Sequence, residues 1–153
     1  MADAFTQLYI HIVIVIKHRE AQISPIWEDE LYKYITGIVQ SKGQKMIAIN
    51  GMPDHLHILI GLTPECILSG LVREIKKSSN SFINRHKLTK ERFYWQPGYG
   101  AFSYSHSQLG RVVNYINRQK EHHKKKDLKD EYIQLLHGFE IEFKQQHLFT
   151  WIN

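Results

Sequence analysis

The 153-residue sequence contains one cysteine, Cys66. A single cysteine excludes an intrachain disulfide framework and a multi-cysteine zinc site, and it is typical of a reducing compartment. The apolar stretch from Leu8 to Ile16 is interrupted by His11 and is far shorter than the roughly 20 residues that span a bilayer. It also lacks a signal-peptide cleavage pattern. We therefore expect a cytoplasmic protein with no membrane segment.

Internal repeats and low-complexity segments are absent as well. The hydrophobic fraction of 42% and the charged fraction of 23% are those of an average globular protein. The length lies in the usual range for one compact domain and is too short for two ordinary ones. The sequence therefore predicts a single domain over residues 1–153.

The charge is unevenly distributed along the chain. Twenty Lys and Arg residues against fifteen Asp and Glu residues give a formal net charge of +5, which favours encounter with a polyanion. Acidic residues gather at 28–30 and 127–142, whereas 73–77 and 111–126 are strongly basic. One face can thus be more positive than the net charge suggests. Many basic proteins bind no nucleic acid, so this pattern is a hint at a nucleic-acid partner and no more.

Hydrophobic periodicity and turn residues predict the order of the elements. Strands are expected at 7–16, 45–50 and 55–62 and within 93–105, and helices at 26–42, at 68–83, from an N-cap at Ser107 to 124–126, and at 129–137. The order β-α-β-β-α-β followed by helices is that of an α+β, ferredoxin-like split βαβ sandwich, an antiparallel sheet covered on one face. This fold serves many functions, so function has to be argued from individual residues.

Two histidines stand in the predicted third strand as His55-Leu56-His57. Side chains alternate along a strand, so both imidazoles share one face and Leu56 takes the other. Two parallel imidazoles can clamp a divalent ion. With ten histidines in the chain, chance alone supplies about 0.6 such patterns, so the pair by itself is weak support for a site.

The predicted third helix carries a second candidate group. Tyr115 and Gln119 are four residues apart and share a helix face, and His122 and His123 follow about one turn later. A tyrosine and a glutamine at this spacing are usually ordinary residues of the surface or of the edge of the core. The two groups become informative only together.

Read together, the segments Met52-Pro53-Asp54-His55-Leu56-His57 and Tyr115-Ile116-Asn117-Arg118-Gln119 closely resemble the single-tyrosine HUH transposases of bacterial insertion sequences, including the REP-associated tyrosine transposases. The likeness also covers Lys17-His18-Arg19, the run from Leu71 to Lys76, Trp95 with Gly98-Tyr99, and the pair His122-His123. Agreement over nearly the whole chain is far more specific than an H-x-H pattern.

The resemblance implies a ferredoxin-like nuclease with an added C-terminal helix that carries the nucleophilic Tyr115. That residue would attack a phosphodiester of single-stranded DNA and leave a 5′-phosphotyrosine and a free 3′-hydroxyl. Attack by another 3′-hydroxyl would then rejoin strands. His55, His57 and, by position, Gln119 would bind Mg²⁺ or Mn²⁺. The family also implies recognition of hairpin-bearing element ends and a homodimer.

The chemistry of these residues agrees with that assignment. A divalent cation on the scissile phosphate stabilises the charge of the transition state, and a tyrosine, with an unperturbed pKa near 10, needs such help. Two imidazoles and an amide oxygen suit Mn²⁺ better than Mg²⁺. Zinc is the rival interpretation, with His55, His57 and either His122 or His123 as ligands. The latter two histidines can instead support the site from outside the ligand set.

The same chain offers candidates for DNA contact. Basic side chains can neutralise phosphates and an aromatic face can stack on an unpaired base; these candidates are Lys17, Arg19, Arg73, Lys76, Lys77, Arg118 and Trp95. Two other functions stay open. One is a domesticated protein that binds folded single-stranded nucleic acid without cutting it, and the other is a metal-dependent phosphohydrolase with water as nucleophile.

Overall fold

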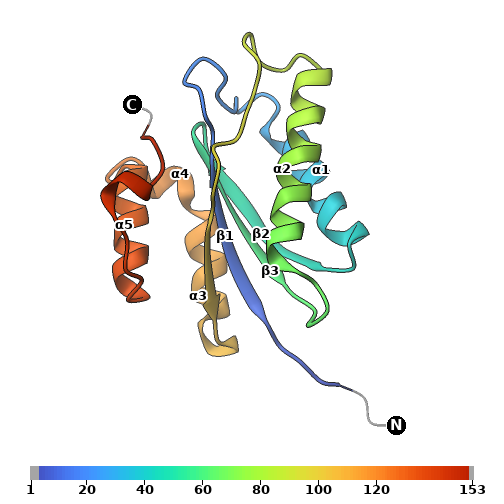
Figure 1. Cartoon of the computed structure of the whole chain (residues 1–153), viewed down its shortest axis with the longest axis vertical. Coiled ribbons are helices and arrows are strands. Elements are labelled where there is room, and N and C mark those ends of the chain that lie inside the picture. Colours follow the sequence, from blue (N-terminus) through green and yellow to red (C-terminus); the bar gives the residue numbers. More distant parts are fainter. Residues whose placement is uncertain (1–3, 152–153) are drawn as a thin grey trace.

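The computed structural model describes residues 4–151, which form a four-stranded antiparallel sheet of order β2-β3-β1-β4. Two helices, α1 and α2, connect its strands (Figure 1). The predicted α+β, ferredoxin-like fold is therefore confirmed. The elements to this point are β1 Tyr9–Val15, α1 Glu28–Ser41, β2 Lys45–Met52, β3 His55–Gly61, α2 Leu68–Arg85 and β4 Gly100–Tyr104.

Alternate residues of β1 and β3 build the main core, on the face covered by α1 and α2. Ile12 and Ile14 of β1 and Leu56, Ile58 and Ile60 of β3 are fully buried there. Truncating one such side chain to alanine costs about 2–5 kcal/mol. The helices contribute Leu31, Ile35, Val39, Leu71, Val72 and Ile75 to the same core.

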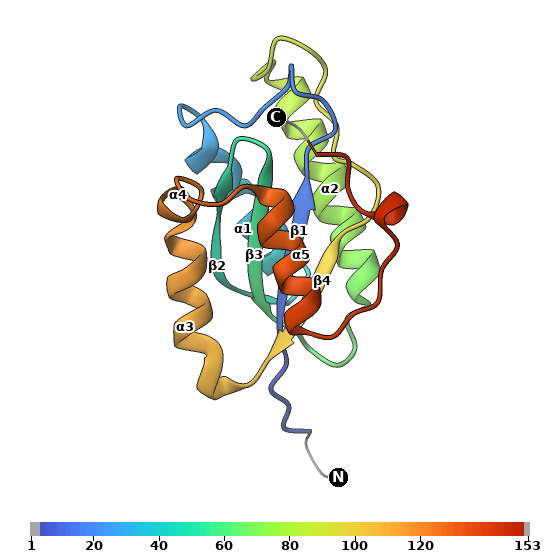
Figure 2. The same ribbon diagram turned by 90° about the vertical axis from the view of Figure 1, so that its left-hand side faces the viewer.

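The other face of the sheet is covered too, which differs from the one-sided sandwich that the sequence predicted. Three helices follow β4: α3 His106–Asn117, α4 Gln119–His122 and α5 Leu128–Gly138, with a short 3-10 turn at Gln145–His147. Figure 2 shows α5 lying in front of the sheet and α3 lying beside β2. The reason is that this face of the strands is also apolar. Val13, Val15 and Leu59 lie on it and have to be covered by further elements.

The predicted third helix is interrupted. It was expected to run on to the lysines at 124–126, but α3 ends at Asn117 and Arg118 leads into α4. A contact from the sheet satisfies the end of the helix, since the Asn50 amide donates to the carbonyls of Ile116 and Asn117 at 3.0 and 3.1 Å. The helix also begins two residues earlier than expected.

The residue that precedes the first turn of α3 is Ser105 rather than the predicted Ser107. Its backbone N–H donates to Oε1 of Gln108 at 3.0 Å, half of a capping box. The helix thus starts almost directly after β4, and this fixes the register with which it crosses β2 and β3.

The turn between β2 and β3 places the first histidine. It consists of Pro53 and Asp54, so His55 opens β3 at once. Gly51, at the end of β2, faces the backbone of His55 so closely that an added Cβ would collide with that carbonyl oxygen. A residue without a side chain is needed there for the two strands to pair at this register.

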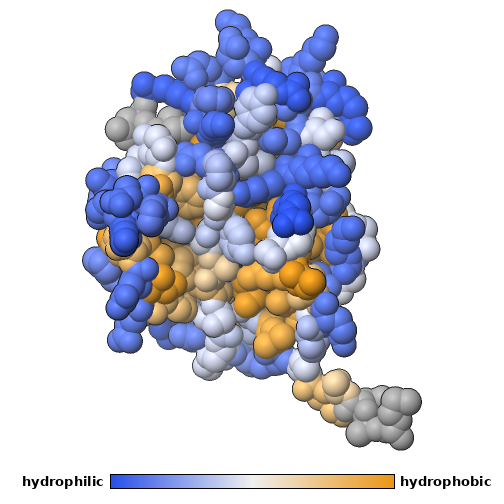
Figure 3. All heavy atoms as spheres, viewed as in Figure 1, coloured by the Kyte–Doolittle hydropathy of each residue, from blue (hydrophilic) through white to orange (hydrophobic). Residues whose placement is uncertain are grey.

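Figure 3 shows hydrophilic residues gathered at the end of the molecule formed by the loops after β1 and before β4. Lys17 and Arg19 are exposed at this end. None of the helices within residues 4–151 combines the length and the apolar character needed to cross a membrane.

Candidate metal centre and tyrosine

His55 and His57 lie on the face of the sheet that α3 and α5 cover. Both imidazoles are completely buried, and Leu56 between them points into the core on the other face. The strand alternation predicted from the sequence therefore holds in the structure. Both histidines aim their Nε2 atoms at a third side chain from outside the sheet.

That side chain is Glu131 of α5, which is 5% exposed. Its Oε1 lies 3.0 Å from Nε2 of His57 and 3.5 Å from Nε2 of His55. Within residues 4–151, these three residues form the one group of three side chains placed to share a metal ion. Glu131 was not predicted from the sequence, because it stands in the acidic segment 127–142. Its position three residues after Leu128 and one before Tyr132, both buried, is the signal that it faces inward.

Gln119 reaches the same point from the start of α4. Its Oε1 lies 3.1 Å from Nε2 of His55, and its Nε2 donates to Oε2 of Glu131 at 3.0 Å. The amide is completely buried. The structure thus brings Gln119 together with the two histidines.

Tyr115 closes the cluster from α3. Its hydroxyl donates to Oε2 of Glu131, and its ring centroid is 5.8 Å from that of His57. Burial and the neighbouring Glu131 carboxylate raise the pKa of the hydroxyl above its usual value. Tyrosine and histidines therefore meet within one chain.

The neighbouring histidines His122 and His123 have different surroundings. His123 turns inward, with Nε2 3.2 Å from Oε1 of Glu131 and its ring centroid 4.7 Å from that of His55. His122 is exposed, and its ring packs beside that of Tyr115 at 4.7 Å between centroids. The two histidines can therefore have different tasks.

Each histidine of β3 has its own partner behind it. Nδ1 of His55 donates to Oδ1 of Asp54 at 2.6 Å, and Nδ1 of His57 lies 2.7 Å from Nε2 of His11, whose Nδ1 is 3.3 Å from the Tyr104 hydroxyl. Such partners orient metal-binding imidazoles. Neither Asp54 nor His11 was singled out from the sequence.

The pKa values of the two histidines shift in opposite directions. Burial favours a neutral His55, but the hydrogen bonds to Asp54 and Glu131 outweigh burial and raise its pKa to about 9. Burial lowers the pKa of His57, which keeps its imidazole neutral. The pKa of Glu131 is well below its usual range, because the hydrogen bonds from His123, His55 and His57 outweigh the effect of burial.

The spacing of these atoms fits a single divalent ion. Two ligand atoms that each lie about 2.1 Å from one ion are roughly 3.0 Å apart at right angles and roughly 3.4 Å apart at the tetrahedral angle. The Glu131–His57, Glu131–His55 and Gln119–His55 separations of 3.0, 3.5 and 3.1 Å fall close to these values. The donor set of imidazole nitrogen, amide oxygen and carboxylate oxygen suits Mn²⁺ and related ions.

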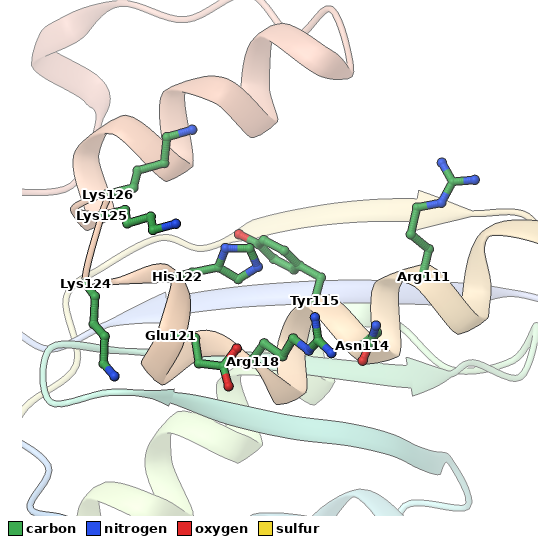
Figure 4. Close-up of a pocket in the computed structure, with 9 residues that line it drawn as sticks. All are labelled: Arg111, Asn114, Tyr115, Arg118, Glu121, His122, Lys124, Lys125 and Lys126. Carbon is green, nitrogen blue, oxygen red and sulfur yellow. The ribbon is translucent and has the colours of Figure 1, made fainter.

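A basic cleft adjoins the tyrosine. Its volume is about 850 Å³, and α3, α4 and the following loop provide its walls (Figure 4). Figure 4 shows Tyr115 and His122 side by side at one side of it. Five of its nine lining residues are basic and one is acidic; we refer to Arg111, Asn114, Tyr115, Arg118, Glu121, His122, Lys124, Lys125 and Lys126 as the basic cleft.

The predicted DNA-contact residues are spread over the molecule. Arg118 lines the basic cleft. Lys17 and Arg19 lie in the loop after β1, whereas Arg73, Lys76 and Lys77 belong to α2, on the opposite face of the sheet from Tyr115 (Figure 1).

Two of these residues have partners inside the protein. Lys76 donates from Nζ to the backbone carbonyls of Gln96 and Gly98. Trp95 is buried in the main core and its indole N–H donates to Ser79 at 2.9 Å. Tyr94, its neighbour, is the more exposed ring.

The sheet, the paired histidines and the facing tyrosine are together those expected of a tyrosine transposase. The family described as "Transposase IS200 like" matches residues 4–119, and the chain belongs to this family. Membership in a transposase family implies DNA-cleaving activity. The matched residues include His55, His57, Tyr115 and Gln119, whereas α5 and Glu131 lie beyond them.

Individual relatives are distant. The chain is 26% identical over 121 residues to the ISDra2 transposase TnpA of Deinococcus radiodurans, covering 75% of this chain and 86% of the relative. A crystal structure described as that of a transposase candidate from Deinococcus radiodurans superposes with a TM-score of 0.62 at 22% identity, over 78% of this chain and 95% of the other.

A second solved structure is that of a REP-associated tyrosine transposase bound to a REP hairpin. It superposes with a TM-score of 0.59 at 19% identity, over 80% of this chain and 74% of the other. At these identities the two structures establish a shared fold.

Proposed function

We propose that this protein cleaves and rejoins single-stranded DNA through a covalent link to Tyr115, with a divalent metal held by His55 and His57. One observation carries the proposal: the tyrosine hydroxyl from α3 and both imidazoles from β3 converge on the same buried carboxylate, which α5 provides. Burying charged groups is costly, so stability alone does not account for a buried cluster of this kind. Function is the better explanation for its presence.

The metal would be held by His55, His57 and Gln119, with Glu131 as a further oxygen ligand. When bound to the scissile phosphate, the ion would stabilise the negative charge of the transition state. Asp54 and His11 keep the two imidazoles in orientation from behind. Mn²⁺ and Mg²⁺ are the ions proposed, and the nitrogen-rich donor set favours Mn²⁺.

Tyr115 supplies the nucleophile. Its oxygen forms a bond to phosphorus while the bond from phosphorus to the 3′ oxygen breaks, which leaves a 5′-phosphotyrosine and a 3′-hydroxyl. The free energy of the broken ester is kept in the new one, so attack by another 3′-hydroxyl rejoins a strand without ATP.

The basic cleft is the proposed path of the DNA strand. Its positive charge lies directly beside Tyr115, where a phosphate must come. A hairpin is the proposed recognition element, in keeping with the solved structure of a REP-associated tyrosine transposase bound to a REP hairpin. The resemblance also leads us to propose a homodimer, although both halves of the site are present in each chain.

The test is trapping of a covalent adduct. Purified protein with Mn²⁺ and single-stranded DNA carrying an imperfect palindrome should give a protein–DNA adduct that survives denaturation. Tyr115→Phe should bind the DNA and form no adduct. Tyr34→Phe, which changes a tyrosine on α1 across the sheet, is the matched control and should form the adduct normally.

Other results would point elsewhere. Cleavage by Tyr115→Phe together with inactivity of His57→Ala would indicate a metal-dependent hydrolase with water as nucleophile. Hairpin binding with no cleavage by the wild-type protein in Mn²⁺ or Mg²⁺ would indicate a non-cutting binder.

A further inference from the structure

The Glu131 carboxylate has two oxygens with different surroundings. Oε1 faces the nitrogen atoms of His55, His57 and His123. Oε2 accepts hydrogen bonds from the Tyr115 hydroxyl and from the Gln119 amide. The side that faces the proposed metal is therefore separate from the side that faces the nucleophile.

The reaction requires that the hydroxyl of Tyr115 lose a proton, because a phenol is mostly protonated at neutral pH. The acceptor must lie within hydrogen-bonding distance of that hydroxyl. Among the described residues, Glu131 accepts the hydrogen bond that this hydroxyl donates. The Gln119 amide holds the same oxygen from the other side, so the carboxylate is fixed in a receiving position.

We propose that Glu131 is the general base of the cleavage step, taking the Tyr115 proton on Oε2 as the oxygen–phosphorus bond forms. This inference rests on the function proposed above. The O–H bond of Tyr115 breaks with transfer of its proton to Oε2, the new O–P bond forms, and the P–O3′ bond breaks. The leaving 3′ oxygen takes one proton from water, and Glu131 later returns its own to water, so protons balance.

A carboxylate is a weak base, but it can act here for a simple reason. As the phenolic oxygen bonds to phosphorus, its remaining proton becomes strongly acidic, and transfer to a carboxylate becomes favourable. Protein kinases use an aspartate in the same way to accept the proton of a substrate hydroxyl. Glu131 lies outside the residues that match the family, so the assignment concerns this chain's own C-terminal helix.

The experiment compares Glu131→Gln with the wild type at saturating Mn²⁺. Glutamine keeps the size of the side chain and an oxygen for the ion, but it accepts no proton at neutral pH. Mn²⁺ binding is measured separately by electron paramagnetic resonance, so that loss of metal is not mistaken for loss of the base. Removal of a general base lowers a rate about 10²–10⁴-fold, and we expect a loss of this size in adduct formation.

A more acidic nucleophile distinguishes a base from a structural support. Site-specific replacement of Tyr115 by difluorotyrosine makes the phenol easier to deprotonate, so the Glu131→Gln defect should be largely rescued. The matched control, Asp130→Asn, changes an exposed acid beside Glu131 on α5 and should retain the wild-type rate. If glutamine prevents folding, as judged by circular dichroism, Glu131→Ser, which also lacks a group that accepts a proton at neutral pH, is tested in the same way.

Two outcomes overturn the proposal. Glu131→Gln can form adduct at the wild-type rate or faster once Mn²⁺ is saturating, in which case the carboxylate is a ligand or a restraint on the tyrosine. Alternatively, the defect can persist unchanged with difluorotyrosine. Failure of the proposed function is a separate result, because then the wild type itself would form no adduct.

Discussion

Nε2 of His11 lies 2.7 Å from Nδ1 of His57, and the two buried rings stack with centroids 4.9 Å apart. Without a metal, His57 donates from Nε2 to Glu131 and accepts from His11 at Nδ1. A metal on Nε2 requires the other tautomer, in which Nδ1 donates to His11. His11 serves both states because its far nitrogen can accept from, or donate to, the Tyr104 hydroxyl.

Replacing His11 with leucine should therefore weaken metal binding. Nδ1–H of His57 would lose its acceptor in the metal-bound state, and loss of such a partner typically lowers affinity 10–100-fold. Electron paramagnetic resonance titration of Mn²⁺ measures the effect. His11→Gln retains an amide acceptor and should recover part of the affinity. Equal affinity of the wild type and the leucine variant would show that His11 does not orient His57.

Substitution of two lysines in the basic cleft should weaken DNA binding in a salt-dependent way. Each phosphate contact to a single strand contributes about 0.7 to the slope of log affinity against log salt, so Lys124→Ala with Lys125→Ala should lower the slope by about 1.4. Fluorescence anisotropy at several salt concentrations measures it. Arg73→Ala with Lys77→Ala on α2 removes the same charge from the opposite face. A larger loss from that pair would place the DNA across α2 instead.

Gly51→Ala should destabilise the fold and disturb the centre. The added methyl group meets the backbone of His55 and Leu56, which cannot yield without shifting β3. Overpacking of this kind costs about 1–3 kcal/mol, measured as the free energy of unfolding in urea. Gly61→Ala, at the other end of β3, has ordinary clearance and is the matched control. Similar stability of both variants would contradict the tight approach at Gly51.

The sequence was sufficient for features that depend on local pattern. Strand alternation set His55 and His57 on one face, and the four-residue spacing of Tyr115 and Gln119 put both on one side, where each contacts Glu131. It was insufficient where a tertiary contact decides the outcome. No glycine or proline marks the helix break at Arg118. The break depends instead on a tertiary contact, in which Asn50 of β2 donates to the carbonyls at the end of α3. Similarly, Glu131 lies in an acidic segment that is solvated in most proteins, and its burial depends on how α5 crosses the sheet.

The metal-free protein should lose stability between about pH 6.5 and pH 9. The pKa of His55 is near 9 in the folded chain and near 6.5 when unfolded, so the folded state holds this proton more tightly. Its contribution is complete below pH 6.5 and is lost as pH rises through 9. Denaturation in EDTA at several pH values measures this loss. Asp54→Asn removes a hydrogen bond that raises the pKa, and it should flatten the dependence.

Mn²⁺ should reverse the trend in the same pH range. The ion needs the lone pair on Nε2 of His55, so binding expels the proton that the metal-free protein holds there. The stabilisation gained on adding a fixed concentration of Mn²⁺ should therefore grow from pH 6.5 to pH 9, while the stability of the EDTA-treated protein falls. Both curves come from the same urea titrations. If Mn²⁺ stabilised the protein equally at both ends of this range, the ion would not be displacing a proton from His55, and the proposed ligand set would be wrong.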